Sequence, residues 1–190
     1  KFWAYPKTGV GTHSYTPKTN TSIGTLTVNF GNTTYDWSNM INKPTSSSTT
    51  AQKDAVSTIM YHCGVALQMD YGPNGSAAYS LLYPINIAQG DRDIPYVLKK
   101  HFRYSSAFGR FKSSPISSYS DAIWKTLIKE ELDKGRPILY SGSDASAGGH
   151  GFICDGYDNN DKFHFNFGWD GSYDGYYALT AINPDSYNFA

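Results

Sequence analysis

The sequence predicts an α+β fold in which the helices come first and an antiparallel sheet comes last. Three stretches in the first two thirds of the chain space their apolar side chains as helices do. The last third instead contains four short strand-like runs separated by turn residues. Helices and strands that are segregated along the chain in this way are typical of an α+β fold rather than of an alternating parallel one.

The first predicted element is a hairpin. In GTLTVNFGNTTYDW, residues 24–37, apolar and polar side chains alternate on both sides of Gly31 and Asn32. A pair of residues of this kind favours a tight turn between two strands. We therefore expect residues 24–37 to fold back on themselves as two paired strands.

Three helices are predicted next. Apolar residues recur at helical spacing over residues 51–63, and Gly64 stands where a C-terminal cap is expected. This spacing places Cys63 on the face predicted to point into the core. A second helix is expected to begin near Ile94 with a proline in its first turn, and a third to cover residues 121–134 before a glycine ends it.

Four strands are predicted near the C-terminal end, in the stretches PILYSG, HGFICDGY, KFHFNFGW and GYYALT. The polar run at residues 158–161 predicts a turn that joins the second and third strands as a hairpin. Along the third strand, three phenylalanines alternate with His164 and Asn166. The rings are therefore expected on one face of the sheet and the polar side chains on the other.

The composition favours one extracellular domain without a polyanionic partner. A length of 190 residues is usual for a single domain. Lysine plus arginine and aspartate plus glutamate number 16 each, so no net field favours nucleic acid or an anionic membrane surface. No apolar run approaches the roughly 20 residues of a membrane span. Charged residues are sparse, at 17%, while tyrosine and glycine are abundant, which favours a secreted protein.

His150 is the first candidate catalytic residue. It follows two glycines, and the predicted hairpin would bring it toward the same end as Asn166. A neutral imidazole oriented by an amide suits a Cys–His peptidase, because the base must keep the tautomer that accepts a thiol proton. The alternative is a hydrogen-bonded histidine at a strand end without a catalytic role. The other histidines lack metal-ligand spacing, so we expect no metal site and only packing or surface roles for them: His13, His62, His101 and His164.

Six stretches of the chain together carry a more specific signal. They are YDWSNM (35–40), MDYGPNGSA (69–77), ELDKGRPILYSG (131–142), GGHGFICDGYD (148–158), FHFNFGWDGSYDGYYAL (163–179) and INP (182–184). In content and order they resemble the streptopain family of secreted bacterial cysteine peptidases, and they extend over nearly the whole chain. The resemblance implies a papain-like fold and cysteine endopeptidase activity.

The resemblance also implies roles for individual residues. His150 would be the general base of the Cys–His pair, and Asn166 would fix its imidazole. Trp169 would shield that contact from water and wall the primed side of the substrate groove. Phe167 stands where the family has a tryptophan, and keeps an aromatic wall there without the indole donor. Main-chain groups at two further positions would hold an extended peptide as an added strand: Ser76 and Gly149.

The nucleophile segment of the family is not found in this sequence. The resemblance places that cysteine about three helical turns before Lys1, and the C-terminal end stops before the family's closing loop and final strand. Cys154 would lie about 13 Å from His150 along one strand, and Cys63 fits a buried helix stripe, so neither is expected to be the nucleophile. Residues 1–190 are thus expected to form a single, incomplete papain-like catalytic domain.

Three functions are compatible with these observations. The leading one is a secreted cysteine endopeptidase that acts on polypeptides, is made as a zymogen with an N-terminal prodomain, and carries its nucleophile on a preceding segment. No cofactor is implied, only a reducing environment for the thiol. The second is a catalytically inactive relative that binds peptides, and the third is an aromatic-rich surface-binding module. A disulfide between the two cysteines stays open.

Overall fold

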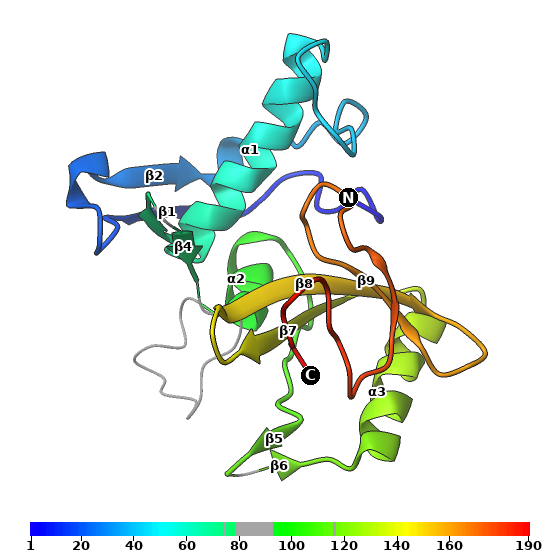
Figure 1. Ribbon diagram of the computed structural model, residues 1–190. Coiled ribbons are helices and arrows are strands. Elements are labelled where there is room, and N and C mark those ends of the chain that lie inside the picture. Colours follow the sequence, from blue (N-terminus) through cyan, green and yellow to red (C-terminus); the bar gives the residue numbers. More distant parts are fainter. Residues whose placement is uncertain (74, 79–92, 116) are drawn as a thin grey trace. The chain divides into compact units, whose positions relative to one another are not determined.

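The computed structural model describes residues 1–73, 75–78, 93–115 and 117–190 (Figure 1). These residues divide into two compact units, which we call the N-terminal unit (residues 1–110) and the C-terminal unit (residues 111–190). The prediction of a single domain stays a prediction. Among the described residues, no helix has both the length and the apolar character needed to cross a bilayer.

The described residues of the N-terminal unit form two small antiparallel ribbons, two α-helices and two short 3₁₀ helices (Figure 1). One ribbon pairs the first two strands, and the other pairs the third and fourth. In chain order the elements are β1 (Thr12–Tyr15), η1 (Thr21–Ile23), β2 (Leu26–Asn29), η2 (Phe30–Asn32), α1 (Thr50–Ala66), β3 (Asp70–Gly72), β4 (Gly75–Ala77) and α2 (Ile94–His101).

The hairpin predicted for residues 24–37 is wrong in its pairing. Its first half forms β2, but the partner of β2 is the upstream strand β1. After β2, the side chain of Asn29 accepts a hydrogen bond from the N–H of Asn32 and opens a 3₁₀ turn that buries Phe30 completely. Burial of a phenylalanine ring contributes about 1.5–3 kcal/mol, which outweighs the local preference of the Gly–Asn pair for a hairpin turn.

Helix α1 is longer than predicted at its C-terminal end. Its first turn is closed by a capping box in which Thr49 and Gln52 each bond the main-chain N–H of the other. The helix then continues through Gly64 instead of ending there. A Cβ on Gly64 would lie 2.0 Å from the hydroxyl oxygen of Tyr71. The glycine therefore permits close packing, and the prediction that it caps the helix is wrong.

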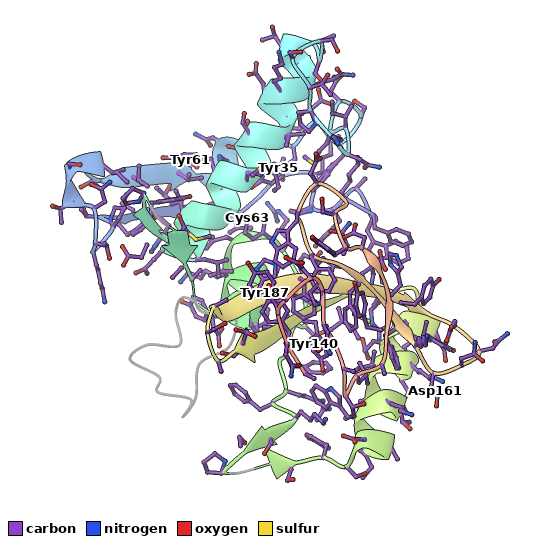
Figure 2. All side chains as sticks on the ribbon, viewed as in Figure 1. Tyr35, Tyr61, Cys63, Tyr140, Asp161 and Tyr187 are labelled. Atoms are coloured by element: carbon purple, nitrogen blue, oxygen red, sulfur yellow. The ribbon has the colours of Figure 1, made fainter. Side chains whose placement is uncertain are left out.

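The buried face of α1 also differs from the predicted one. His62 is buried, and its Nδ1 lies 3.0 Å from the hydroxyl oxygen of Tyr35. The adjacent residue Cys63 is exposed, so the prediction that it points into the core is wrong (Figure 2). Apolar residues occur on several faces of this helix, as the exposed Met60 and the buried Val65 show. Spacing was therefore insufficient to identify the face that packs.

The C-terminal unit follows the predicted order of one helix and then four strands. Each pair of neighbouring strands in the main sheet is antiparallel, in the order β10-β9-β8-β7. Helix α3 begins and ends close to its predicted bounds, and α2 of the N-terminal unit begins at Ile94, where its start was predicted. The elements of this unit are β5 (Ser113–Ser114), β6 (Ser117–Ser118), α3 (Asp121–Asp133), β7 (Ile138–Asp144), β8 (Gly148–Tyr157), β9 (Phe163–Asn166) and β10 (Gly175–Tyr177).

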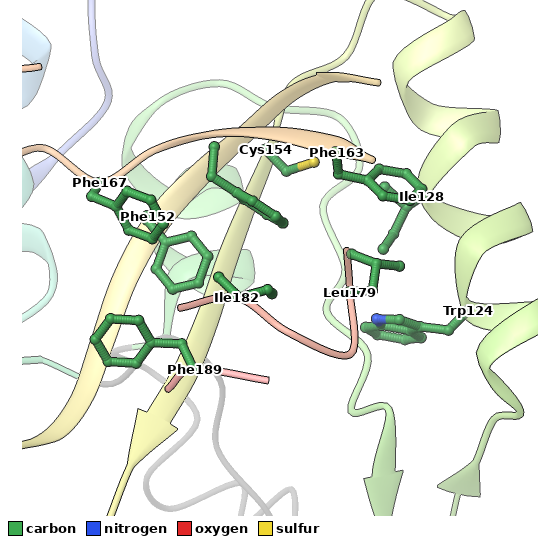
Figure 3. Packing of buried hydrophobic residues seen from close by; sticks show 10 residues of the cluster. Trp124, Ile128, Phe152, Cys154, Phe163, Phe167, Leu179, Ile182 and Phe189 are labelled. Carbon is green, nitrogen blue, oxygen red and sulfur yellow. The ribbon is translucent and has the colours of Figure 1, made fainter. Parts of the chain in front are cut away.

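One hydrophobic core holds the C-terminal unit together (Figure 3). Helix α3 contributes Trp124 and Ile128, and β8 contributes Phe152. The phenylalanines that alternate along β9 are buried, whereas His164 between them is only partly so, as the pattern predicted. The segment after β10 packs onto the same core through three side chains: Leu179, Ile182 and Phe189.

Candidate active site

Strand β8 positions His150 near its N-terminal end. His150 lies opposite Gly142 of β7 in the register of the sheet. The preceding Gly148 has φ of 83°, a left-handed conformation that glycine adopts without strain as the chain turns into β8. The imidazole is half-buried, and it stacks at 5.9 Å on Phe152, which lies two residues further along the same face of the strand.

The imidazole of His150 is held by a main-chain group and by aromatic rings. Its Nε2 lies 2.8 Å from the carbonyl oxygen of Phe167. Because a carbonyl oxygen can only accept, Nε2 carries the hydrogen, and the lone pair of the neutral ring lies on Nδ1. Trp169 stacks on the imidazole with ring centroids 4.8 Å apart and an angle of 26° between the planes. These contacts fix both the tautomer and the plane of the ring.

Asn166 is not joined to His150 in the hydrogen bonds that the structure records for the described residues. It ends β9 opposite Ile153, three residues beyond His150 on β8, so the two side chains project to opposite faces of the sheet. Its Oδ1 accepts the N–H of Gly168 at 2.9 Å. The amide thus shapes the turn that presents the Phe167 carbonyl, and its predicted influence on the imidazole stays a prediction.

Phe167, and with it the carbonyl group that binds His150, is held in place by two contacts. Its main-chain N–H donates to Oδ1 of Asp174 at 2.9 Å. Its ring is 1% exposed and stacks on Trp169 at 5.4 Å. The ring therefore packs in the core, which differs from the substrate wall expected for it. Sequence reasoning missed Asp174 and this carbonyl, since a main-chain acceptor leaves no mark in the residue types.

The remaining predicted substrate contacts lie on exposed strand positions. Gly149 pairs with Ser143 across β7 and β8. Ser76 pairs with Tyr71 in the β3–β4 ribbon and belongs to the N-terminal unit. The next residue along β4, Ala77, helps to line a hollow of about 210 Å³ beside Tyr15 and Asp70.

Both cysteines are free thiols, and neither is placed as an activated nucleophile. Cys154 is fully buried, and burial raises its pKa to about 12, so the thiol stays protonated near neutral pH. Cys63 is exposed but lies in the last turns of α1, where the negative end of the helix dipole disfavours a thiolate. Among the residues that the structure describes, no three potential ligands gather as a metal site.

The family of the chain follows from comparison with known proteins. A model of the peptidase C10 family matches residues 1–177. The chain belongs to the peptidase C10 family. Streptopain of Streptococcus pyogenes is 29% identical over 190 residues, which cover 98% of this chain and 44% of that protein. The thiol protease/hemagglutinin PrtT of Porphyromonas gingivalis is 28% identical, covering 98% of this chain and 20% of PrtT.

A solved structure shares the fold of this chain. Active wild-type interpain A, a cysteine protease of Prevotella intermedia, is 36% identical with a TM-score of 0.84, over 98% of this chain and 73% of that one. The predicted α+β fold and the resemblance to the streptopain family are thereby confirmed. This chain of 190 residues spans less than half the length of the curated relatives it matches.

Proposed function

We propose that this chain supplies the general base and most of the substrate cleft of a secreted cysteine endopeptidase. The observation that carries the proposal is the hydrogen bond from Nε2 of His150 to the carbonyl oxygen of Phe167, because it leaves Nδ1 as the basic nitrogen. Membership of the C10 family supports the class of reaction. The sparse charge of the sequence supports secretion, and residues 1–190 would form the larger part of one catalytic domain.

In the proposed reaction, Nδ1 of His150 takes the proton from a cysteine thiol, and the thiolate attacks the scissile carbonyl carbon. Main-chain N–H groups stabilise the oxyanion that forms. The C–N bond then breaks as the imidazolium returns the proton to the leaving amine, which leaves a thioester. Water, deprotonated by the same Nδ1, hydrolyses the thioester, and the proton then returns to the departing thiolate.

The other predicted residues have supporting roles in this proposal. Trp169 keeps water from the bond between His150 and Phe167, and Asn166 holds the turn that carries the Phe167 carbonyl. Main-chain groups at two exposed strand positions bind the polypeptide substrate as an added strand: Ser76 and Gly149.

The nucleophile would lie on a segment outside these 190 residues, together with an N-terminal prodomain. The burial of Cys154 and the helix-end position of Cys63 support this part of the proposal. A solved fragment of prointerpain A from Prevotella intermedia, 36% identical with a TM-score of 0.77, supports a proform. It covers 97% of this chain and 55% of that fragment.

The test is to treat the full-length natural protein with a thiol-reactive peptidyl epoxide and to map the labelled peptide by mass spectrometry. We expect the label on a cysteine outside residues 1–190, and its loss in His150→Ala. His164→Ala is the matched control, because Nδ1 of His164 lies 2.6 Å from Oδ1 of Asp155. No hydrogen bond or ring contact recorded for the described residues joins His164 to His150, Phe167 or Trp169. Label only on Cys63 or Cys154, or none at all, would exclude the proposal and favour an inactive peptide-binding protein.

A further inference from the structure

The carboxylate of Asp144 joins two chain segments that flank His150. Asp144 is the last residue of β7 and pairs with Gly148, the first residue of β8. Each of its two oxygens serves a different segment. Asp144 does not bond the imidazole itself, whose Nε2 donates to the carbonyl oxygen of Phe167.

The first segment is the turn between β7 and β8. Oδ1 of Asp144 accepts the N–H of Ser146 at 2.7 Å, the hydroxyl of Ser146 at 2.6 Å and the N–H of Ala147 at 2.8 Å. Hydrogen bonds to a charged acceptor are stronger than those between neutral groups. Because the turn runs directly into Gly148 and His150, this oxygen fixes the path of the main chain that leads to the base.

The second segment lies near the C-terminal end. Oδ2 of Asp144 accepts the N–H of Asn188 at 2.9 Å. The next residue, Phe189, places its ring 5.7 Å from the imidazole of His150 and 6.4 Å from Trp169. Another tie of this segment is the N–H of Phe189, which donates to the carbonyl of Ile182 at 2.9 Å. The Asp144 carboxylate thus helps to position the ring of Phe189 beside the imidazole of His150.

The segment packs directly on the strand that faces His150. Gly142, which pairs with His150 across the sheet, has so little space that a Cβ would lie 2.2 Å from the carbonyl oxygen of Phe189. A small shift of the C-terminal segment would therefore reach the imidazole through the Phe189 ring. Hydrogen bonds hold the pKa of Asp144 well below its usual range. The largest contribution comes from the Ser146 hydroxyl, and the next from the main-chain N–H of Asn188. The Asp144 carboxylate is therefore charged at the near-neutral pH at which a Cys–His pair acts.

We infer that Asp144 is a positioning residue for the proposed general base. Its two oxygens tie the β7–β8 turn to the segment at Asn188, and so hold the backbone and the aromatic surroundings of His150 in one arrangement. The inference rests on the proposed function of His150.

Three variants test the two ties. Asp144→Asn keeps one acceptor oxygen but replaces the other with an NH₂ group, so one segment faces a donor where it needs an acceptor. Ser146→Ala is the matched control, since it removes one hydrogen bond of the turn and leaves the link to Asn188 in place. Asn188→Pro removes the main-chain N–H of the second tie, together with the side-chain oxygen that accepts the N–H of Ala190, and serves as the alternative if Asp144→Asn does not fold.

The measurements are kcat and KM of the full-length protein on a peptide substrate, and the imidazole ¹⁵N resonances of His150 in the same protein. We expect Asp144→Asn to lower kcat about tenfold, as supporting residues of a site commonly do, with KM within about twofold. We also expect it to shift the His150 resonances. Ser146→Ala keeps the two main-chain N–H bonds of the turn and the bond to Asn188, so its effect on both should be much smaller than that of Asp144→Asn. Asn188→Pro should resemble Asp144→Asn.

Unchanged kcat and unchanged His150 resonances in a folded Asp144→Asn protein would overturn the inference, as would a lower melting temperature without a shift of those resonances. A wild-type protein without peptidase activity, or a His150→Ala variant that keeps it, would instead remove the proposed function. In that case the resonances alone still decide whether Asp144 positions the imidazole.

Discussion

The indole of Trp169 stacks on the imidazole of His150 at 4.8 Å, with 26° between the ring planes. Trp169→Ala removes this surface and admits water to the bond between His150 and the Phe167 carbonyl. Aromatic pairs contribute about 0.5–1.5 kcal/mol, so we expect kcat/KM to fall about three- to tenfold. Trp169→Phe, which retains a ring, should keep most of the activity. Equal activity of the alanine variant and the wild type in a peptide hydrolysis assay would contradict the stacking role.

Asp174 controls the position of the imidazole through the main chain of Phe167. Asp174→Ala leaves the N–H of Phe167 without its acceptor, so the carbonyl that binds Nε2 of His150 loses one of its supports. We expect kcat to fall about tenfold, and the His150 imidazole to lose its single tautomer in ¹⁵N spectra. Asp174→Asn can keep an acceptor oxygen and should stay near wild type. The role would be refuted by a single, unshifted tautomer in the alanine variant.

Asn166 provides a test between a direct and an indirect influence on the base. Its Oδ1 accepts the N–H of Gly168, so Asn166→Asp preserves the acceptor and is expected to keep kcat within about threefold of wild type, whereas Asn166→Ala loses about tenfold. If the NH₂ group of Asn166 instead had to donate a hydrogen bond at the imidazole itself, Asn166→Asp would be as damaging as Asn166→Ala, because a carboxylate cannot donate. Steady-state kinetics of the two variants distinguish these cases.

Gly142 has no room for a side chain. A Cβ there would lie 2.2 Å from the carbonyl oxygen and 2.6 Å from the Cβ of Phe189. Gly142→Ala must displace that segment, and overpacking of this kind costs about 1–3 kcal/mol. Gly151→Ala is the control on the neighbouring strand, because a Cβ on Gly151 meets nothing within 4 Å. Thermal unfolding should show a lower midpoint for Gly142→Ala alone, and equal midpoints would contradict the close approach.

Two buried histidines predict that the protein loses stability in mild acid. Desolvation lowers the pKa of His62 and of His101 below the ordinary value of 6.5. The unfolded chain, which has the higher pKa values, therefore binds more protons as the pH falls. The free energy of unfolding should be greatest above pH 6.5 and should decrease as the pH drops below it.

Urea denaturation at pH 7.5, 6.5 and 5.5 measures this dependence. His62→Gln removes one of the two titrating groups, and should make the decrease below pH 6.5 shallower. A free energy of unfolding that is the same at pH 7.5 and 5.5 would show that these histidines are protonated equally in both states.

Most of the secondary structure could be predicted because its signals are local. Alternation along KFHFNFGW placed its phenylalanines on one face. A proline marked the beginning of α2, and a glycine marked the end of α3. The pairing of β2 with β1 could not be predicted in this way, since THSY has little apolar alternation. The exposed position of Cys63 was missed because α1 carries apolar residues on several faces.

The residue types alone were enough to single out His150 and the family, since an imidazole and an ordered set of motifs are visible in any sequence. They could not reveal that Phe167 contributes its carbonyl oxygen instead of its ring. Nor could they reveal that Asp174 and Asp144 bind main-chain N–H groups near the base. Every residue but proline has the same main-chain donor and acceptor, so the fold, by bringing distant segments together, selects which of these groups meets the imidazole.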